Sequence, residues 1–366
     1  MATIEEQIAE LEEQISNTKY NKATEGHIGK LKAKIAKLSE EAEKRRSRKA
    51  NTKGFYVKKA GDSTVALIGF PSVGKSTLLN QLTGAKSSVG AYHFTTLDIV
   101  PGVLVYNHAK IQILDMPGLI KDASRGKGRG REVIAAARAS DIILFVIDVF
   151  NANIEVLFNE LYDSGIRLDQ RAPDVVITSS GQGGVIVKPT LKLTKITEEI
   201  VRDMTIAYGY INATVVVRED INVEQMLDVL SGNRVYIKSL MAVNKVDMAL
   251  PGQLDGVIKK HKDFRLIPVS AVTGFGIEDL KQGLYETIDM IRVYLKPQGQ
   301  EPDMEVPLIV KRGNSIADVC ELIHRDFKNQ FRYAMIWGTS AKFPGQTVGM
   351  DHVLHDEDVV SIIVKR

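Results

Sequence analysis

One short stretch constrains the fold of this chain more than any other. Residues 69–76 read Gly-Phe-Pro-Ser-Val-Gly-Lys-Ser and match the pattern G-x-x-x-x-G-K-[ST]. An apolar run at residues 64–70 precedes the loop, and a helical pattern begins at about Lys75. Glycines let backbone N–H groups wrap around a phosphate, and a helix N-terminus adds positive potential. The stretch therefore predicts a strand–loop–helix unit that binds phosphate, the alternative being an accidental glycine loop.

The loop also assigns roles to single side chains. Lys75 would bring its charge to the β- and γ-phosphates of a nucleotide, and Ser76 would bind Mg²⁺. A chance match to the pattern in a chain of this size is on the order of 1% from ordinary residue usage. The residues expected to contact the nucleotide here are Phe70, Pro71, Ser72, Val73, Gly74, Lys75, Ser76 and Thr77.

A second motif ends another buried strand. Residues 115–118 read Asp-Met-Pro-Gly and follow the apolar run at residues 111–114. Asp115 can hold Mg²⁺ through water, and the Gly118 N–H can meet the γ-phosphate. Alone this motif is weak, because an aspartate at a strand end is often a turn residue. Its position one buried strand after the phosphate loop makes it a strong signal.

A third motif indicates which base is bound. Residues 244–247 read Asn-Lys-Val-Asp and follow the apolar run at residues 239–243. Asp247 can accept hydrogen bonds from guanine N1–H and N2–H₂, whereas adenine would leave the carboxylate unpaired and is rejected. Asn244 would tie loops together, and the Lys245 stem would cover the base. The alternative is a solvated turn.

The apolar runs alternate with helical patterns, which predicts a parallel sheet covered on both faces. After the last run, a backbone N–H of Ser270 or Ala271 can reach guanine O6. The five expected strands are residues 64–70, 111–114, 141–147, 239–243 and 265–269.

Apolar residues at helical spacing within residues 1–42 predict two helices that bury their stripes against each other as a hairpin. The basic residues 44–53 that follow are interpreted as a linker, which either contacts RNA phosphates or is merely solvated. Beyond residue 296 the chain predicts a separate small α+β domain, with a helix at residues 316–327 and strands at residues 308–310 and 359–364.

Residues 151–238 interrupt the α/β rhythm and predict an inserted α+β subdomain. Two short apolar runs, residues 175–178 and 185–187, flank a glycine-rich segment at residues 179–184. This predicts a β-hairpin rather than a second phosphate loop, because a lysine and a following helix are missing. The other expected elements are helices at residues 196–208 and 224–230 and a strand at residues 213–217.

Composition limits the setting of the protein. The 366 residues are 44% apolar, enough for two or three domains, and the net charge of +3 argues against a wholly basic nucleic-acid binder. The single cysteine, Cys320, cannot form an internal disulfide, which fits a reducing cytosol. The most apolar stretch, residues 142–150, is too short to span a membrane and is broken by Asp148. We expect a cytoplasmic protein without membrane association.

The strand-end motifs, in this order, resemble those of translation-factor-class GTPases. Residues 94–97, Phe-Thr-Thr-Leu, are similar to the switch I motif of the Obg-like GTPases, which makes Thr96 rather than Thr95 the switch threonine. Residues 21–33, 69–77, 91–96 and 126–131 resemble the developmentally regulated GTP-binding proteins (DRG) of that group. Residues 337–338 and 349–360 resemble a TGS domain, a ubiquitin-like β-grasp module.

This resemblance implies an α/β fold: a P-loop GTPase domain with a mostly parallel sheet, an N-terminal helical hairpin, an inserted subdomain that resembles a ribosomal protein, and a C-terminal TGS domain. The expected boundaries are residues 1–53 for the hairpin and basic linker, 54–150 and 239–290 for the two parts of the GTPase domain, 151–238 for the insertion and 291–366 for the TGS domain.

The resemblance also completes the expected site for GTP or GDP. Mg²⁺ would be held by Ser76 and Thr96, with Asp115 acting through water, and Lys75, Thr96 and Gly118 would act in catalysis. Leu119 stands where a Ras-type protein carries the glutamine that orients the attacking water. Intrinsic hydrolysis is therefore expected to be slow. The water would be positioned by the backbone, by a partner, or by a monovalent cation such as K⁺ near the P-loop, and these alternatives stay open.

The glycine-rich basic stretch at residues 121–131 follows directly. One of its cationic side chains would approach the phosphates on closure, or the stretch would be a solvated loop that contacts RNA or a partner. The cations in question are Arg125, Lys127, Arg129 and Arg131.

The implied function is a monomeric switch that hydrolyses GTP and associates with the ribosome or ribosomal RNA, with a regulatory protein as a further partner. Two alternatives remain. The first is an ATPase of the Obg-like group, against which Asp247 argues. The second, which Leu119 keeps open, is a non-catalytic RNA- or ribosome-binding scaffold in which GTP is a structural ligand.

Overall fold

The structure is a computed structural model that describes residues 3–19, 21–22, 24–49, 61–84, 100–116 and 130–365. The chain forms two compact units, one from Met1–Phe55 with Gly165–Tyr236, and one from Tyr56–Ser164 with Ile237–Arg366. The second unit carries all of the predicted nucleotide motifs that the structure describes.

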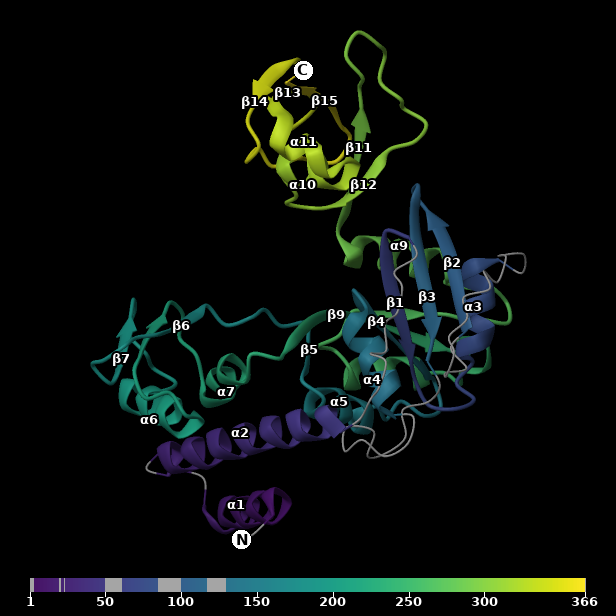
Figure 1. The fold of residues 1–366 in the computed structure, drawn as a ribbon. Coiled ribbons are helices and arrows are strands. Elements are labelled where there is room, and N and C mark those ends of the chain that lie inside the picture. Colours follow the sequence, from purple (N-terminus) through teal and green to yellow (C-terminus); the bar gives the residue numbers. More distant parts are fainter. Residues whose placement is uncertain are drawn as a thin grey trace. The chain divides into compact units, whose positions relative to one another are not determined.

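The central sheet of the second unit has the strand order β10-β9-β4-β1-β3-β2 (Figure 1). A further short strand, β5 (Ile166–Leu168), belongs to the first unit. All pairings along the main path are parallel except that of β2 with β3, so the predicted mostly parallel sheet is confirmed. The strands are β1 (Ser63–Ile68), β2 (Val100–Tyr106), β3 (Ala109–Asp115), β4 (Ile142–Asp148), β9 (Val235–Asn244) and β10 (Leu266–Pro268).

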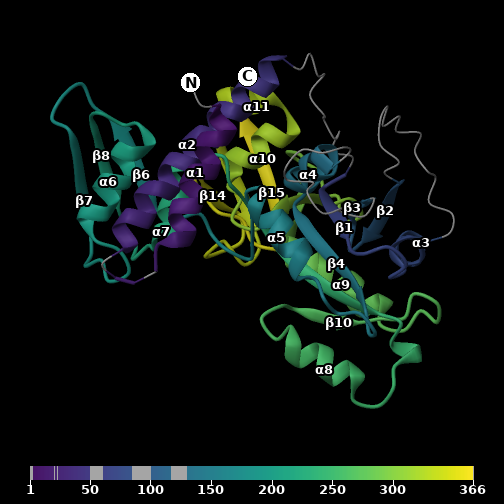
Figure 2. The same ribbon diagram turned by 90° about the horizontal axis from the view of Figure 1, so that it is seen from below.

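Helices cover both faces of this sheet. Leu144 and Val146 of β4 join the core that packs beneath α3 (Lys75–Thr83) and α9 (Ile277–Ile288). Phe145 points to the opposite face, where its ring meets Phe158 of α5 at a centroid distance of 4.7 Å. Because both faces are covered, the strands are continuously apolar, as expected. The remaining helices are α4 (Gly130–Ala139), α5 (Glu155–Asp163), the 3₁₀ turn η1 (Val246–Met248) and α8 (Gln253–Lys260), and Figure 2 shows α8 next to β10.

The C-terminal part of the second unit is a five-stranded sheet with the order β12-β11-β15-β13-β14. The predicted helix at residues 316–327 is interrupted at His324, whose extended backbone (φ −162°) ends α10 while its ring caps α11. The elements are β11 (Met290–Leu295), β12 (Leu308–Lys311), α10 (Ile316–Ile323), α11 (Arg325–Gln330), β13 (Phe331–Trp337), β14 (Gln346–Val348) and β15 (Asp358–Val364).

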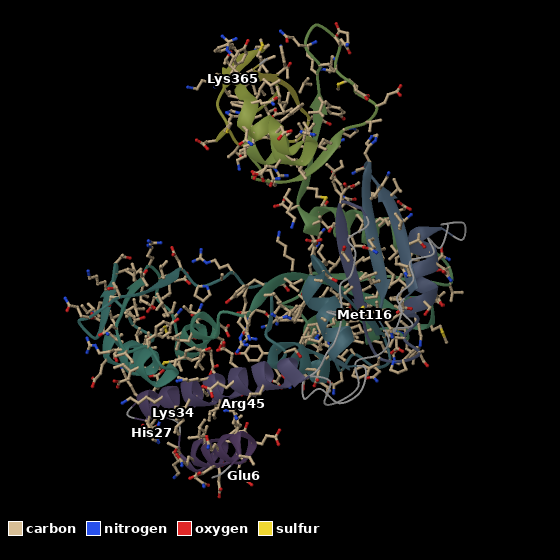
Figure 3. All side chains as sticks on the ribbon, in the orientation of Figure 1. Glu6, His27, Lys34, Arg45, Met116 and Lys365 are labelled. Atoms are coloured by element: carbon tan, nitrogen blue, oxygen red, sulfur yellow. The ribbon has the colours of Figure 1, made fainter. Side chains whose placement is uncertain are left out.

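The first unit joins the N-terminal helices to the insertion. Its elements are α1 (Ile4–Asn17), α2 (Glu25–Lys49), β6 (Val175–Ser179), β7 (Val185–Pro189), α6 (Glu198–Tyr208), β8 (Ala213–Val217) and α7 (Val223–Ser231). Figure 3 labels Glu6 on α1 and Lys34 on α2. The Glu6 carboxylate accepts from the Thr3 N–H at 2.7 Å and so caps the start of α1.

The two N-terminal helices pack on each other, as the predicted hairpin requires, and α2 packs on the inserted subdomain as well. α1 contains no buried residue, whereas Ile28 and Leu31 of α2 are buried. Lys30 forms an ion pair with Asp203 of α6 at 2.7 Å, and α2 also makes an ion pair with α7. Part of the apolar stripe of α2 therefore packs on the inserted subdomain, where Ala33 joins the core. α2 also continues to Lys49, so most of the segment expected to be a linker is helical.

The predicted hairpin in the insertion was wrong. β6 and β7 are strands, but β8 lies between them, antiparallel to β6 and parallel to β7. The residues of β8 that alternate toward the core, among them Val215 and Val217, are fully buried, so this strand occupies the centre of the small sheet. A local turn signal cannot reveal that a later strand takes the central place.

None of the helices in the described ranges is both long enough and apolar enough to cross a membrane.

Candidate nucleotide-binding site

The predicted motifs lie at one edge of the central sheet. Residues 69–74 follow β1, Asp115 ends β3 and Asn244 ends β9. Because β1, β3, β4 and β9 are parallel, their carboxyl ends meet at the same edge, where open α/β sheets bind ligands. Met116, labelled in Figure 3, comes directly after β3 and is only 1% exposed, so the end of this strand is held in the core.

The loop after β1 has a backbone shape that needs its glycines. Gly74 has φ +94°, and a Cβ there would lie 2.4 Å from Nδ2 of Asn244. A Cβ on Gly69 would lie 2.2 Å from the carbonyl oxygen of Val146 in β4. Ser72 also adopts a positive φ of 66°. The loop therefore approaches the neighbouring strands so closely that side chains at both glycines are excluded.

Lys75 begins α3 and folds back over the loop. Its ammonium donates hydrogen bonds to the carbonyl oxygens of Gly69 at 2.9 Å and Phe70 at 3.0 Å. Burial lowers the pKa of Lys75, and the nearby charge of Asp115 opposes this shift. The cation is thus held at the centre of the loop, where a phosphate would replace the carbonyl oxygens as its partner.

Oxygen atoms suited to a hard cation lie beside this lysine. The Ser76 hydroxyl donates to Oδ2 of Asp115 at 2.7 Å. A hydroxyl and a carboxylate at one point are ligands that Mg²⁺ accepts, together with water and phosphate oxygens. The donor set therefore fits the predicted metal. Thr96, Gly118 and Leu119, and the loop cations Arg125, Lys127 and Arg129, lie outside the described residues.

Asn244 connects two loops from inside the protein. Its side chain is 3% exposed; Nδ2 donates to the carbonyl oxygen of Val73 at 2.8 Å, and Oδ1 accepts from the Ala271 N–H at 2.9 Å. The phosphate loop is thereby joined to the loop after β10. The sequence assigned this connecting role to the asparagine at this position.

The atoms proposed to read the base have unequal surroundings. Asp247 lies in η1, is exposed, and accepts no hydrogen bond within the described part of the chain. The Ser270 N–H donates to the Phe275 carbonyl at 2.9 Å, and the Ala271 N–H donates to Asn244. Contact between guanine O6 and the Ala271 N–H therefore requires that O6 share this donor with Asn244.

One residue at this edge was missed by motif reasoning. Asp148 ends β4 and lies opposite Asn244 in the β4–β9 pairing. Its Oδ2 receives a hydrogen bond from the Lys245 ammonium at 2.9 Å. A signal was present in the sequence, because Asp148 ends an otherwise apolar strand in the same way as Asp115.

Comparison with known proteins identifies the modules. Residues 64–179 match the family model described as 50S ribosome-binding GTPase, residues 182–290 match the C-terminal region of that domain, and residues 291–364 match the TGS domain. An uncharacterized GTP-binding protein of Methanocaldococcus jannaschii is 52% identical over 99% of this chain and 93% of its own length. Developmentally-regulated GTP-binding protein 2 of Homo sapiens is 40% identical over 98% of this chain and 99% of its own length.

The chain belongs to the DRG family of GTP-binding proteins. Developmentally-regulated G-protein 2 of Arabidopsis thaliana adds a plant relative, 42% identical over 99% of this chain and 92% of its own length. This DRG protein combines N-terminal helices, a P-loop GTPase domain with an inserted subdomain, and a C-terminal TGS sheet domain. The resemblance inferred from the sequence is confirmed, and so is the fold class.

Proposed function

We propose that this DRG protein is a slow, Mg²⁺-dependent GTP hydrolase whose nucleotide state controls its association with the ribosome. The observation that carries the proposal is the convergence of three groups on one sheet edge: the Lys75 ammonium inside the loop, the Ser76–Asp115 oxygen pair, and the Asn244 bridge. Phosphate, metal and base recognition thus fall within one site, as a nucleotide requires.

In this proposal each group has a defined task. Lys75 neutralises the β- and γ-phosphates, and the backbone of residues 70–77 surrounds them. Ser76 and Thr96 would hold Mg²⁺, with Asp115 acting through water, and the ion would supply charge that stabilises the transferring phosphoryl group. The carboxylate of Asp247 accepts from guanine N1–H and N2–H₂. The exposed, unpaired state of Asp247 among the described residues supports this assignment.

The expected rate is low because Leu119 can neither donate nor accept a hydrogen bond. The attacking water is positioned instead by the backbone around Gly118, by a partner, or by K⁺ near the P-loop. Stimulation by ribosomes, by a regulatory protein or by K⁺ compared with Na⁺ would distinguish these sources.

The association with ribosomes is supported by the family model, whose description is that of a 50S ribosome-binding GTPase. We propose that the GTPase domain, residues 54–150 and 239–290, passes its nucleotide state to three other modules. These modules are residues 1–53, 151–238 and 291–366. In this proposal the protein is a cytoplasmic monomer that contacts ribosomal RNA and a regulatory protein.

A second candidate is a non-catalytic ribosome-binding scaffold in which GTP is a structural ligand. Leu119, at the place of a water-orienting glutamine, favours this candidate. An ATPase is disfavoured by Asp247, since adenine offers no partner for its carboxylate.

Co-sedimentation with purified ribosomes tests the switch. The protein is loaded with GDP or with a non-hydrolysable GTP analogue, and the pelleted fraction is measured over a range of ribosome concentrations. We expect at least about tenfold tighter binding in one nucleotide state, which corresponds to a coupling within the usual range for switches. Equal binding in both states would exclude nucleotide control. A K75A variant, which cannot neutralise the phosphates, serves as the control and should give equal binding in both conditions.

A further inference from the structure

Asp148 is a nearly buried carboxylate, 8% exposed, that shares the sheet edge with the nucleotide motifs. Its Oδ1 accepts from the N–H groups of Phe150 at 3.1 Å and Asn151 at 2.7 Å. Its Oδ2 receives the ammonium of Lys245 at 2.9 Å. A carboxylate at this depth is tolerated only with such partners, and Lys245 supplies a charged one.

Lys245 is held from a second side as well. Its ammonium donates to the carbonyl oxygen of Ser72 in the phosphate loop at 2.8 Å. The backbone of Lys245 is left-handed, with φ +65°, a conformation that a residue with a side chain adopts only under constraint. Ser72, its partner, has φ +66°. Two contacts, one to β4 and one to the phosphate loop, thus hold the ammonium at the end of a lysine whose backbone is in an unusual conformation.

The pairing of the strands brings Lys245 close to Asp148. Asp148 and Asn244 are opposite each other in adjacent parallel strands, and the Val149 N–H donates to the Asn244 carbonyl at 3.1 Å. The Lys245 ammonium therefore lies between the Asp148 carboxylate and the Ser72 carbonyl oxygen. Its four-carbon stem, which is otherwise flexible, is restrained through these two contacts of the ammonium.

We infer that Asp148 is a positioning residue for nucleotide recognition: it holds the Lys245 stem in the place where that stem packs against the guanine base. The inference rests on the proposed base-binding role of residues 244–247. Without the carboxylate, only the Ser72 carbonyl restrains the ammonium. The stem then loses rotamer freedom at the moment of binding, and this cost lowers the affinity for guanine nucleotides.

The Asp148→Asn variant isolates the contact with Lys245. An asparagine keeps an oxygen for the Phe150 and Asn151 N–H groups but removes the negative charge from the ammonium. The Lys245→Met variant removes the ammonium while it keeps an apolar stem. Asp141→Asn is the matched control, because Asp141 lies just before the opposite end of the same strand, where it accepts from the Thr64 N–H at 3.0 Å.

The test is a double-mutant cycle on the full chain, with the Kd of GDP measured by calorimetry. D148N is expected to raise this Kd about tenfold, as the loss of a charge-assisted hydrogen bond typically does. In the K245M background, Asp148→Asn is expected to raise the Kd of GDP less than twofold. D141N is expected to stay within twofold of the unmodified protein. If D148N does not fold, K245M alone must raise the Kd about tenfold, and an unchanged Kd would overturn the inference.

A second readout separates positioning from general stability. At saturating GTP, D148N is expected still to release phosphate in a single turnover, because Lys75, Ser76 and Asp115 are unchanged, whereas unfolding would abolish the release. The inference would be overturned if D148N raised the Kd of GDP equally with Lys245 present and with Lys245 replaced by methionine. An unchanged Kd in D148N would overturn it as well. Absent phosphate release from the unmodified protein with intact GDP binding would refute the proposed hydrolysis alone, since the cycle depends only on binding.

Discussion

Replacing Asn244 with alanine removes a side chain that joins the phosphate loop to the loop after β10. The substitution deletes two hydrogen bonds, from Nδ2 to the Val73 carbonyl and from the Ala271 N–H to Oδ1. Both partner residues are nearly buried, Val73 at 3% and Ala271 at 2% exposure. Water therefore has little access to the two backbone groups that lose their partners.

The expected cost follows from these contacts. A buried donor or acceptor left without a partner costs about 1–3 kcal/mol, so the two together should lower the free energy of unfolding by about 3 kcal/mol. For a cooperative unit of about 150–250 residues, each kcal/mol shifts the midpoint by roughly 2–4 °C, so the thermal midpoint should fall by roughly 6–12 °C.

Differential scanning calorimetry of the nucleotide-free protein measures this shift. Asn159→Ala is a suitable control, because Asn159 is exposed on α5 and its loss should change stability by no more than about 0.5 kcal/mol. A shift for N244A as small as that of the control would show that the bridge does not stabilise the protein, and would refute the reasoning.

Three further predictions concern separate features. Gly74→Ala should raise the Kd of GDP about 10- to 100-fold, because the left-handed backbone is strained by a side chain and the new Cβ would collide with Asn244; an unchanged Kd in calorimetry would contradict the close approach. Asp247→Asn should shift preference from guanine to xanthine nucleotides in a competition assay, and retained GTP preference would count against base reading by this carboxylate. Hydrogen bonds from the backbone and hydroxyl of Ser315 hold the pKa of Asp318 below its ordinary value of 3.8. A carboxyl group with a lowered pKa stabilises the fold at pH values above its ordinary pKa. The difference in thermal midpoint between the unmodified protein and Asp318→Ala should therefore be constant near neutral pH and shrink as the pH falls below 3.8. A difference that grows in acid would contradict this sign.

The parallel sheet was predictable because its strands carry an unusual signal. Strands covered on both faces are continuously apolar, and β1 and β4 are buried along their whole length. The antiparallel strand β2 was not predicted, since Pro101 and Gly102 suggest a break in a strand. In the structure β2 ends the sheet, where proline is tolerated, and a Cβ on Gly102 would lie 2.6 Å from the Thr83 side chain.

The residue types of the candidate site were predictable, but most contacts between them were not. Each motif has a local pattern that identifies its chemistry, as in the lysine after a glycine loop. The links from Asn244 to Val73 and from Lys245 to Asp148 join residues far apart in the chain. They depend on the strand order, which places β4 between β1 and β9, and no local pattern contains that order.

The most direct measurement is single-turnover release of phosphate from GTP, with enzyme in excess and ATP as the competing substrate. We expect slow release from GTP that requires Mg²⁺, is abolished in Lys75→Ala, and is faster with ribosomes, with no release from ATP. Bound GTP that yields no phosphate with or without ribosomes, or equal release from ATP, would contradict a guanine-specific switch.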